Sequence, residues 1–176
     1  VSGDLNADGK TDLIVTAEGY SSSTGRAYIF YNDGSIPTTA ATADVIITGE
    51  TASDLFGISL TVGDLNADGK TDLIVTADGY SSSTGRAYIF YNDGSIPTTA
   101  ATANVIITGE TASNRFGDSV AAGDLNADGK VDLIVGSFWY SSFAGRAYIF
   151  YNGSIITENA SGADVAITGE TSSSFS

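Results

Sequence analysis

The chain repeats itself every sixty residues, and this repetition limits the folds that it can adopt. Residues 3–53 and 63–113 differ only at positions 18/78 and 44/104, and a third, more diverged copy begins at Gly123. Near-identical copies must make the same contacts with their neighbours. The sequence therefore predicts like units stacked side by side.

The second copy is complete and contains four short segments with the composition of β-strands, at residues 58–62, 73–76, 87–91 and 105–108. The first alternates between apolar and polar residues, and the others are apolar, β-branched or aromatic. A polar loop bracketed by glycine separates the second from the third, and Asn-Asp-Gly turn chemistry follows the third. No stretch has the period of an amphipathic helix.

Four antiparallel strands joined in sequence make a meander sheet, and sheets with two apolar faces must stack on like sheets. We predict an all-β fold of β-propeller blades. The alternative is a β-solenoid, which usually has shorter coils and parallel strands, whereas the hairpin-like loops here favour antiparallel pairing. The predicted blades are residues 1–57, with a truncated opening strand, 58–117 and 118–176.

Three blades are fewer than the roughly four to eight of a closed propeller. Both ends of the chain fall inside a repeat. We therefore expect a fragment or a trimmed mature segment. Further blades of the same parent protein, or a second copy of the chain, would complete the ring.

Residues 64–72, with the sequence Asp-Leu-Asn-Ala-Asp-Gly-Lys-Thr-Asp, form a loop suited to a hard cation. Oxygen-bearing side chains at alternate positions point inward together, and Gly69 permits the positive φ of a sharp turn. Lys70 is expected to turn its side chain outward and offer its carbonyl, and Asp72 to close the shell. Calcium takes six to eight oxygen ligands and tolerates irregular geometry.

The same loop occurs at residues 4–12 and 124–132, so we predict one Ca²⁺ per repeat, three in total. The predicted ligands are Asp4, Asn6, Asp8, Lys10 and Asp12, then Asp64, Asn66, Asp68, Lys70 and Asp72, then Asp124, Asn126, Asp128, Lys130 and Asp132.

Two other structures share features of this loop. An EF-hand shares the early positions but needs a bidentate Glu at the twelfth, which is Val15, Val75 or Val135 here, and it needs flanking helices. An Asx-rich turn without metal is the other alternative. Three copies with every ligand position intact favour the metal site.

Charge and composition exclude several function classes. Acidic residues number 21 against 7 basic ones, which argues against nucleic-acid binding. The chain has no Cys and no His, so disulfides, zinc fingers, thiol catalysis and the commonest general base are absent. No apolar run reaches the length of a membrane span. Near-identical copies also give carboxylates like environments, which disfavours a catalytic pair, and we predict no enzyme activity.

The repeat resembles the FG-GAP repeat of integrin α-subunit β-propellers. Phe-Gly at 56–57 and 116–117, the acidic loop with its following strand at 62–75, and Gly-Arg-Ala-Tyr-Ile-Phe at 85–90 carry the resemblance. The Gly-Ala-Pro element departs from the family pattern, with Thr76-Ala77 and Gly136-Ser137 in its place. The resemblance implies a seven-bladed calcium-binding propeller in the complete protein, secreted or on the cell surface, acting in adhesion or ligand binding.

A meander places the loops opposite the metal sites at one end, and we expect a binding face there for a protein or glycan ligand. Its aromatic residues are Tyr20, Tyr80, Tyr140, Trp139 and Phe143. Packing between blades is the alternative role for these rings. A lectin that binds sugars at these loops is the alternative function.

Two further features are local. Arg26, Arg86 and Arg146 are expected to pair with nearby carboxylates. Asn152-Gly153-Ser154 and Asn159-Ala160-Ser161 fit the glycosylation pattern, which matters in a eukaryotic source.

Overall fold

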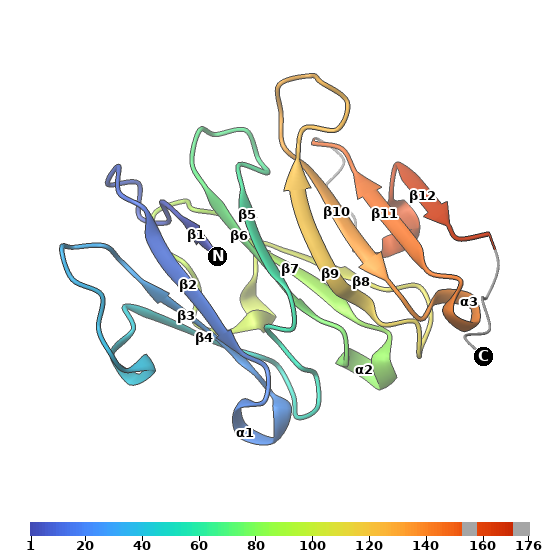
Figure 1. Cartoon of the computed structure of the whole chain (residues 1–176), viewed down its shortest axis with the longest axis horizontal. Helices are drawn as coiled ribbons and strands as arrows, with labels where there is room; N and C mark the ends of the chain where they lie inside the picture. Colours follow the sequence, from blue (N-terminus) through green and yellow to red (C-terminus); the bar gives the residue numbers. More distant parts are fainter. Residues whose placement is uncertain (153–157, 171–176) are drawn as a thin grey trace.

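A computed structural model describes residues 1–152 and 158–170 of the chain. Within them, three four-stranded antiparallel sheets lie side by side (Figure 1). The strands of each sheet are neighbours in sequence order, as in a meander. The predicted all-β fold of propeller blades is confirmed, and the three sheets do not close into a ring.

The strands lie close to the predicted segments. The first blade contains β1 (Ser2–Gly3), β2 (Asp12–Ala17), β3 (Arg26–Phe30) and β4 (Val45–Thr48). The second contains β5 (Leu60–Gly63), β6 (Asp72–Ala77), β7 (Arg86–Phe90) and β8 (Val105–Thr108). The third contains β9 (Phe116–Gly123), β10 (Asp132–Ser137), β11 (Arg146–Phe150) and β12 (Val165–Thr168).

Short helical turns occupy loops that the sequence predicted only as polar connections. They are α1 (Tyr20–Ser23), α2 (Tyr80–Ser83) and α3 (Tyr140–Phe143), with 3₁₀ turns at Ala40–Thr42, Ala100–Thr102 and Ala160–Gly162. Ser81, Ser82 and Ser83 have φ of 48°, 58° and 60°. These turns are therefore left-handed and carry no helical period that a sequence pattern could reveal.

The hydrophobic core lies between the blades rather than within them. One cluster joins Leu5, Ile14, Ala27, Ile29 and Ile47 of the first blade to Leu73, Val75, Tyr88 and Phe90 of the second. The next joins Leu65, Ile74, Ala87, Ile89 and Ile107 of the second blade to Leu133, Val135, Tyr148 and Phe150 of the third. We call the first set of each cluster, with its repeat equivalents, the front face of a blade, and the second set the rear face.

The two interfaces between blades also contain equivalent hydrogen bonds. The Thr48 amide donates to the Thr98 carbonyl at 3.0 Å, and the Thr108 amide donates to the Glu158 carbonyl at 3.0 Å. Short parallel bridges accompany them, such as Gly25 with Phe56. Each blade therefore meets the next in the same register.

None of the helices in the described ranges is long and apolar enough to cross a membrane.

Candidate metal centre

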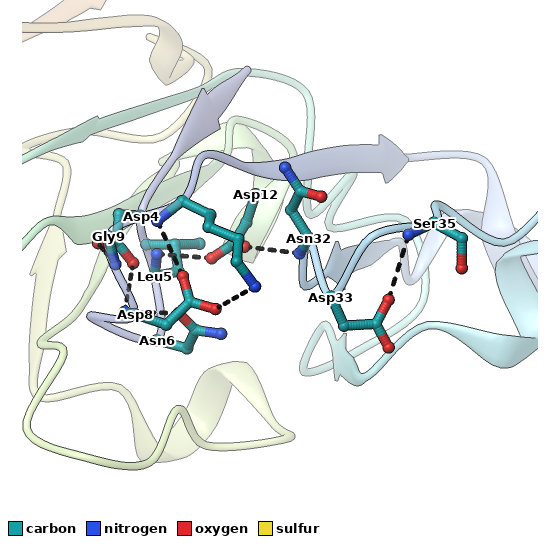
Figure 2. Close-up of polar contacts among 10 residues, drawn as sticks. Asp4, Leu5, Asn6, Asp8, Gly9, Asp12, Asn32, Asp33 and Ser35 are labelled. Carbon is teal, nitrogen blue, oxygen red and sulfur yellow. Dashed lines mark hydrogen bonds and ion pairs between the residues drawn. The ribbon is translucent and has the colours of Figure 1, made fainter.

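The acidic loop of each repeat connects the first strand of a blade to the second. In the first blade it runs from the end of β1 to the start of β2, beside the turn that follows β3 (Figure 2). Ala7 and Gly9 have φ of 58° and 83°, and their counterparts in the other loops are alike. The predicted positive φ at Gly69 is confirmed, at 85°.

The first three ligand positions converge on the backbone of the loop. The Asp8 amide donates to Asp4 Oδ1 at 3.1 Å and to Asn6 Oδ1 at 3.0 Å. The Gly9 amide donates to Asp4 Oδ2 at 2.9 Å, and the Lys10 amide donates to Asp8 Oδ1 at 2.9 Å. The other two loops repeat these bonds. Side chains at alternate positions therefore turn inward together.

The last ligand position lies at the buried base of the loop. Asp12 Oδ2 accepts from the Leu5 amide at 2.8 Å, and Asp12 Oδ1 accepts from the Asn32 amide at 2.9 Å (Figure 2). Asp72 and Asp132 hold the same two partners in their own blades. This carboxylate therefore holds the loop against the sheet. Through Asn32 it also bonds the turn that follows β3.

Lys10 and its neighbours set the charge of the first loop. Its ammonium lies 3.5 Å from Asp8 Oδ2, at an exposed position. The amide hydrogen bond from Lys10, together with its positive charge, holds the pKa of Asp8 below its usual value. In the second loop, burial and the charges of Asp64 and Asp68 raise the pKa of Asp72, against the two amide bonds. The carboxylates of a loop thus repel one another across it.

The donor set suits a hard divalent cation. Each loop offers carboxylate and amide oxygens and a backbone carbonyl, the ligands that calcium prefers. An ionised carboxylate has about four lone-pair sites, so an oxygen that accepts one amide bond can still ligate. Among residues 1–152 and 158–170, no three acidic side chains already form a tight cluster. An ion would be held by Asp4, Asn6, Asp8, the Lys10 carbonyl and Asp12, and by their equivalents.

Sequence reasoning missed the asparagine that follows β3, β7 and β11. Besides donating its amide to the loop Asp, Asn152 donates Nδ2 to the Leu65 carbonyl at 2.8 Å, in the loop of the preceding blade. Asn92 is buried, and its Nδ2 has no hydrogen-bond partner among the described residues. The signal was available, because Phe-Tyr-Asn recurs at 30–32, 90–92 and 150–152.

At the opposite end, the arginines that open the third strands mostly pair as predicted. Arg86 contacts Glu50 of the preceding blade at 2.7 Å, and Arg146 contacts Glu110 at 3.2 Å. Tyr88 also donates its hydroxyl to Glu50, at 2.8 Å. Burial, followed by the Glu50 hydrogen bond, raises the pKa of Tyr88 well above its ordinary value.

The tyrosines of the expected binding face support these arginines. The guanidinium carbons of Arg26, Arg86 and Arg146 lie 3.8, 3.6 and 3.7 Å from the ring centroids of Tyr20, Tyr80 and Tyr140. Arg26 contacts Tyr20 and Thr48 but has no carboxylate partner in the described part of the chain.

The third blade carries an exposed aromatic cluster at the same end. Phe138, Trp139 and Phe143 are exposed, and both other rings contact the Phe143 ring. Arg115, which is paired with Asp78, lies over the Trp139 ring. Trp139 and Phe143 of the expected binding face therefore lie together, and Phe138 joins them.

The two glycosylation patterns lie at blade contacts. Gly153 and Ser154 of the first are outside the described residues, and the side-chain amide of Asn152 is bonded to Leu65. In the second, Asn159 Oδ1 accepts from the Ser161 amide and Nδ2 donates to the Gly109 carbonyl. A glycan replaces one of the two hydrogens of such a nitrogen, so it would have to fit at a blade contact beside the remaining hydrogen bond.

Comparison with known proteins places the repeats in a family. The model of the FG-GAP repeat matches residues 1–30, 56–90 and 116–150. These ranges contain all three acidic loops and the strands that flank them.

Several curated relatives are similar over most of the chain. Phosphatidylinositol-glycan-specific phospholipase D of Bos taurus is 34% identical over 151 residues, covering 77% of this chain and 18% of the relative. Integrin alpha-PS5 of Drosophila melanogaster is 34% identical over 156 residues, covering 85% of this chain and 14% of the relative. Integrin alpha-5 of Xenopus laevis is 34% identical over 112 residues, covering 58% and 10%. The chain thus spans less than a fifth of these relatives, and it belongs to the FG-GAP repeat family.

Proposed function

We propose that this chain is a calcium-stabilised propeller module of a secreted or cell-surface protein, acting as a structural or adhesive scaffold. The observation that carries the proposal is the threefold recurrence of one loop, with the same inward-turned oxygens and the same buried aspartate at its base. Relatives named as integrin alpha subunits support the scaffold role.

Calcium would act by reversing the electrostatics of the loop. Three carboxylates of one loop repel each other, and a pair about 4 Å apart costs roughly 4 kcal/mol at an effective dielectric of 20. A dication turns this repulsion into attraction. Because the closing aspartate also holds the turn after the third strand, an ion in the loop would tie three strands together. Binding to the folded state alone raises its stability.

The test is thermal unfolding of the chain in excess calcium and in excess chelator. We expect a higher melting temperature in calcium, by several degrees for each roughly 1 kcal/mol gained in a domain of this size. The double variant with Asp64→Asn and Asp68→Asn removes ligands from one of the three loops. It should reduce the calcium-induced rise in melting temperature by about a third. Asp93→Asn, which removes a charge from a neighbouring turn outside the ligand set, is the matched control. An unchanged melting temperature would refute the calcium role.

Calcium-assisted sugar binding is the second candidate function. The exposed cluster of Phe138, Trp139 and Phe143 favours it, because aromatic faces can stack on sugar rings and serine hydroxyls flank them. A glycan array probed with the chain and with Trp139→Ala, each with and without calcium, separates the two functions. If the chain binds no glycan on the array, sugar binding is refuted and the scaffold role is the remaining proposal.

The remaining parts of the proposal concern partners and chemistry. We propose that the partners are further blades of the same kind, supplied by the same polypeptide or by a second copy, with a protein or glycan ligand at the loops. Residues 1–57, 58–117 and 118–176 are the proposed units. We propose no enzymatic activity for these repeats, because near-identical copies give their carboxylates like environments, which disfavours a catalytic pair.

A further inference from the structure

The asparagine that follows the third strand of the third blade reaches the acidic loop of the second blade. Asn152 Nδ2 donates to the Leu65 carbonyl at 2.8 Å, although the two residues lie 87 positions apart in the chain. Leu65 lies between two of the proposed ligands, Asp64 and Asn66. We propose that Asn152 is a positioning residue for the metal site of the preceding blade. This role rests on the proposed calcium function of the loops, and it assigns control of one loop to a residue outside the proposed ligand set.

Leu65 is held by three different contacts, so the bond from Asn152 acts on a well-fixed point of the loop. The Leu65 amide donates to Asp72 Oδ2 at 2.8 Å, and its side chain, 2% exposed, packs in the cluster between the second and third blades. The Leu65 carbonyl and the Asn66 amide belong to one planar peptide unit, so holding the carbonyl also sets the direction of the Asn66 backbone. The position of a proposed ligand therefore depends on a donor that the next blade supplies.

The other contacts of the second loop show why this donor matters. The side chains of Asp64, Asn66 and Asp68 accept amides of the loop itself. Leu65 and Asp72 instead connect the loop to the blades. Groups outside the coordination shell that orient ligands typically change metal affinity by about 10–100-fold when they are removed. Asn152 is placed to act in this way.

Asn152 is held in turn by its own blade. Its backbone amide donates to Asp132 Oδ1 at 3.0 Å, and its Nδ2 also donates to the Val131 carbonyl at 3.4 Å. A side-chain amide has two donor hydrogens, so it can serve both carbonyls at once. The contact with the second blade is the shorter of the two, and truncation of the side chain leaves the backbone bond to Asp132 in place. Loss of the side chain should therefore affect the second loop more than the third.

The junction of the first and second blades provides an internal comparison. Asn92 holds the same repeat position as Asn152, and its backbone amide donates to Asp72 Oδ1 at 3.0 Å in the same way. Its Nδ2, however, has no hydrogen-bond partner among the described residues. The Leu5 amide still donates to Asp12 Oδ2 at 2.8 Å. The side chain of Asn92 should therefore have no effect on the first loop.

The test is calcium titration by isothermal titration calorimetry of the whole chain, with one loop active at a time. Asparagine replaces the aspartates at the first and fifth positions of the other two loops, as in Asp4→Asn with Asp8→Asn. With only the second loop active, Asn152→Ala should weaken calcium binding about 10–100-fold. With only the third loop active, its effect should be smaller, because the Val131 contact is longer. Asn92→Ala, with only the first loop active, is the matched control and should leave the affinity unchanged.

A second variant separates the hydrogen bond from packing. Asn152→Leu keeps a side chain of similar size but has no donor, and it should weaken the second loop as Asn152→Ala does. Melting temperatures recorded in chelator show that each variant is folded at the temperature of the titration.

The possible failures of this inference and of the calcium proposal are distinguishable. A parent chain that binds calcium, with a second loop insensitive to both Asn152 variants, would overturn the positioning role alone. Equal losses in the second and third loops would also overturn it, because they would indicate a general destabilisation. A parent chain that binds no calcium in any loop would overturn the calcium proposal and this role with it.

Discussion

The buried aspartate at the base of each loop has two roles that the exposed loop residues lack. Asp72 is fully buried, and both of its oxygens accept backbone amides, one from its own loop and one from Asn92. Removing either partner would leave a buried group unsatisfied. These two hydrogen bonds therefore hold the loop against the sheet.

A glycine at the start of the third strand is predicted to matter because of the next blade. Gly85 has φ +83°, and a Cβ there would lie 1.9 Å from the Phe116 carbonyl oxygen. Gly145 has φ +77°, but its nearest contact would be 3.8 Å away. In dilute solution, Gly145→Ala should cost about 1–2 kcal/mol from backbone strain. Gly85→Ala should cost about 1–3 kcal/mol more from overlap.

Urea unfolding of the two variants measures the difference. Because the residues occupy the same place in their repeats and have similar φ, the comparison removes the effect of strain. Equal losses would mean that the backbones of the second and third blades separate easily at this point.

At the scale of the element, the arginine that opens the third strand links neighbouring blades through one glutamate. Glu50 accepts from Arg86 and from the Tyr88 hydroxyl, and the Glu50 and Arg86 side chains are mostly buried. Glu50→Ala should destabilise the chain by about 1–3 kcal/mol, because it leaves two polar groups without their partner.

Glu170→Ala is the control for this prediction, since Glu170 holds the same place in the third repeat and is exposed. It should change the free energy of unfolding by less than about 0.5 kcal/mol in dilute solution. Chemical denaturation of both variants decides the matter. If Glu50→Ala leaves the free energy of unfolding unchanged, the contact aligns neighbouring blades without stabilising them.

Strand positions could be predicted from the sequence because composition and turn residues set them locally. The four segments predicted for the second repeat begin and end within two residues of β5 to β8. The pairing of Arg86 with a carboxylate was also anticipated, though not the identity of Glu50, which lies 36 residues away in another blade. The left-handed serine turn at 81–83 could not be foreseen, because serine has no marked preference for positive φ.

The contacts of the aspartate that closes the acidic loop could not be predicted from the sequence for a similar reason. Alternation predicts that Asp4 and Asn6 turn inward together, and both side chains accept the Asp8 amide. That Asp12 also binds the Asn32 amide depends on the sheet bringing residues twenty apart together. The contact could not be predicted because its two residues lie far apart in the sequence, and no local pattern identifies such a pair.

At the scale of the whole molecule, identical residues contribute differently to stability according to the blade in which they lie. Every residue of β6 is buried, because blades cover both faces of the middle sheet, whereas burial alternates along the first four residues of β2. Local sequence is the same in both strands. Stability is therefore set by neighbours, as in a linear repeat protein.

Leu73→Ala and Leu13→Ala turn this difference into a prediction. Leu73 is fully buried between blades, and its replacement should cost about 2–5 kcal/mol through lost burial and a cavity. Leu13 occupies the same repeat position but is 36% exposed, so its replacement should cost about 1 kcal/mol in dilute solution. Thermal or urea unfolding at low and high protein concentration compares them. A Leu13 cost that rises with concentration means that a partner blade covers the first rear face. Equal costs at the lowest concentration would contradict the prediction. They would mean that Leu13 is as well covered in dilute solution as Leu73, by something other than the three blades.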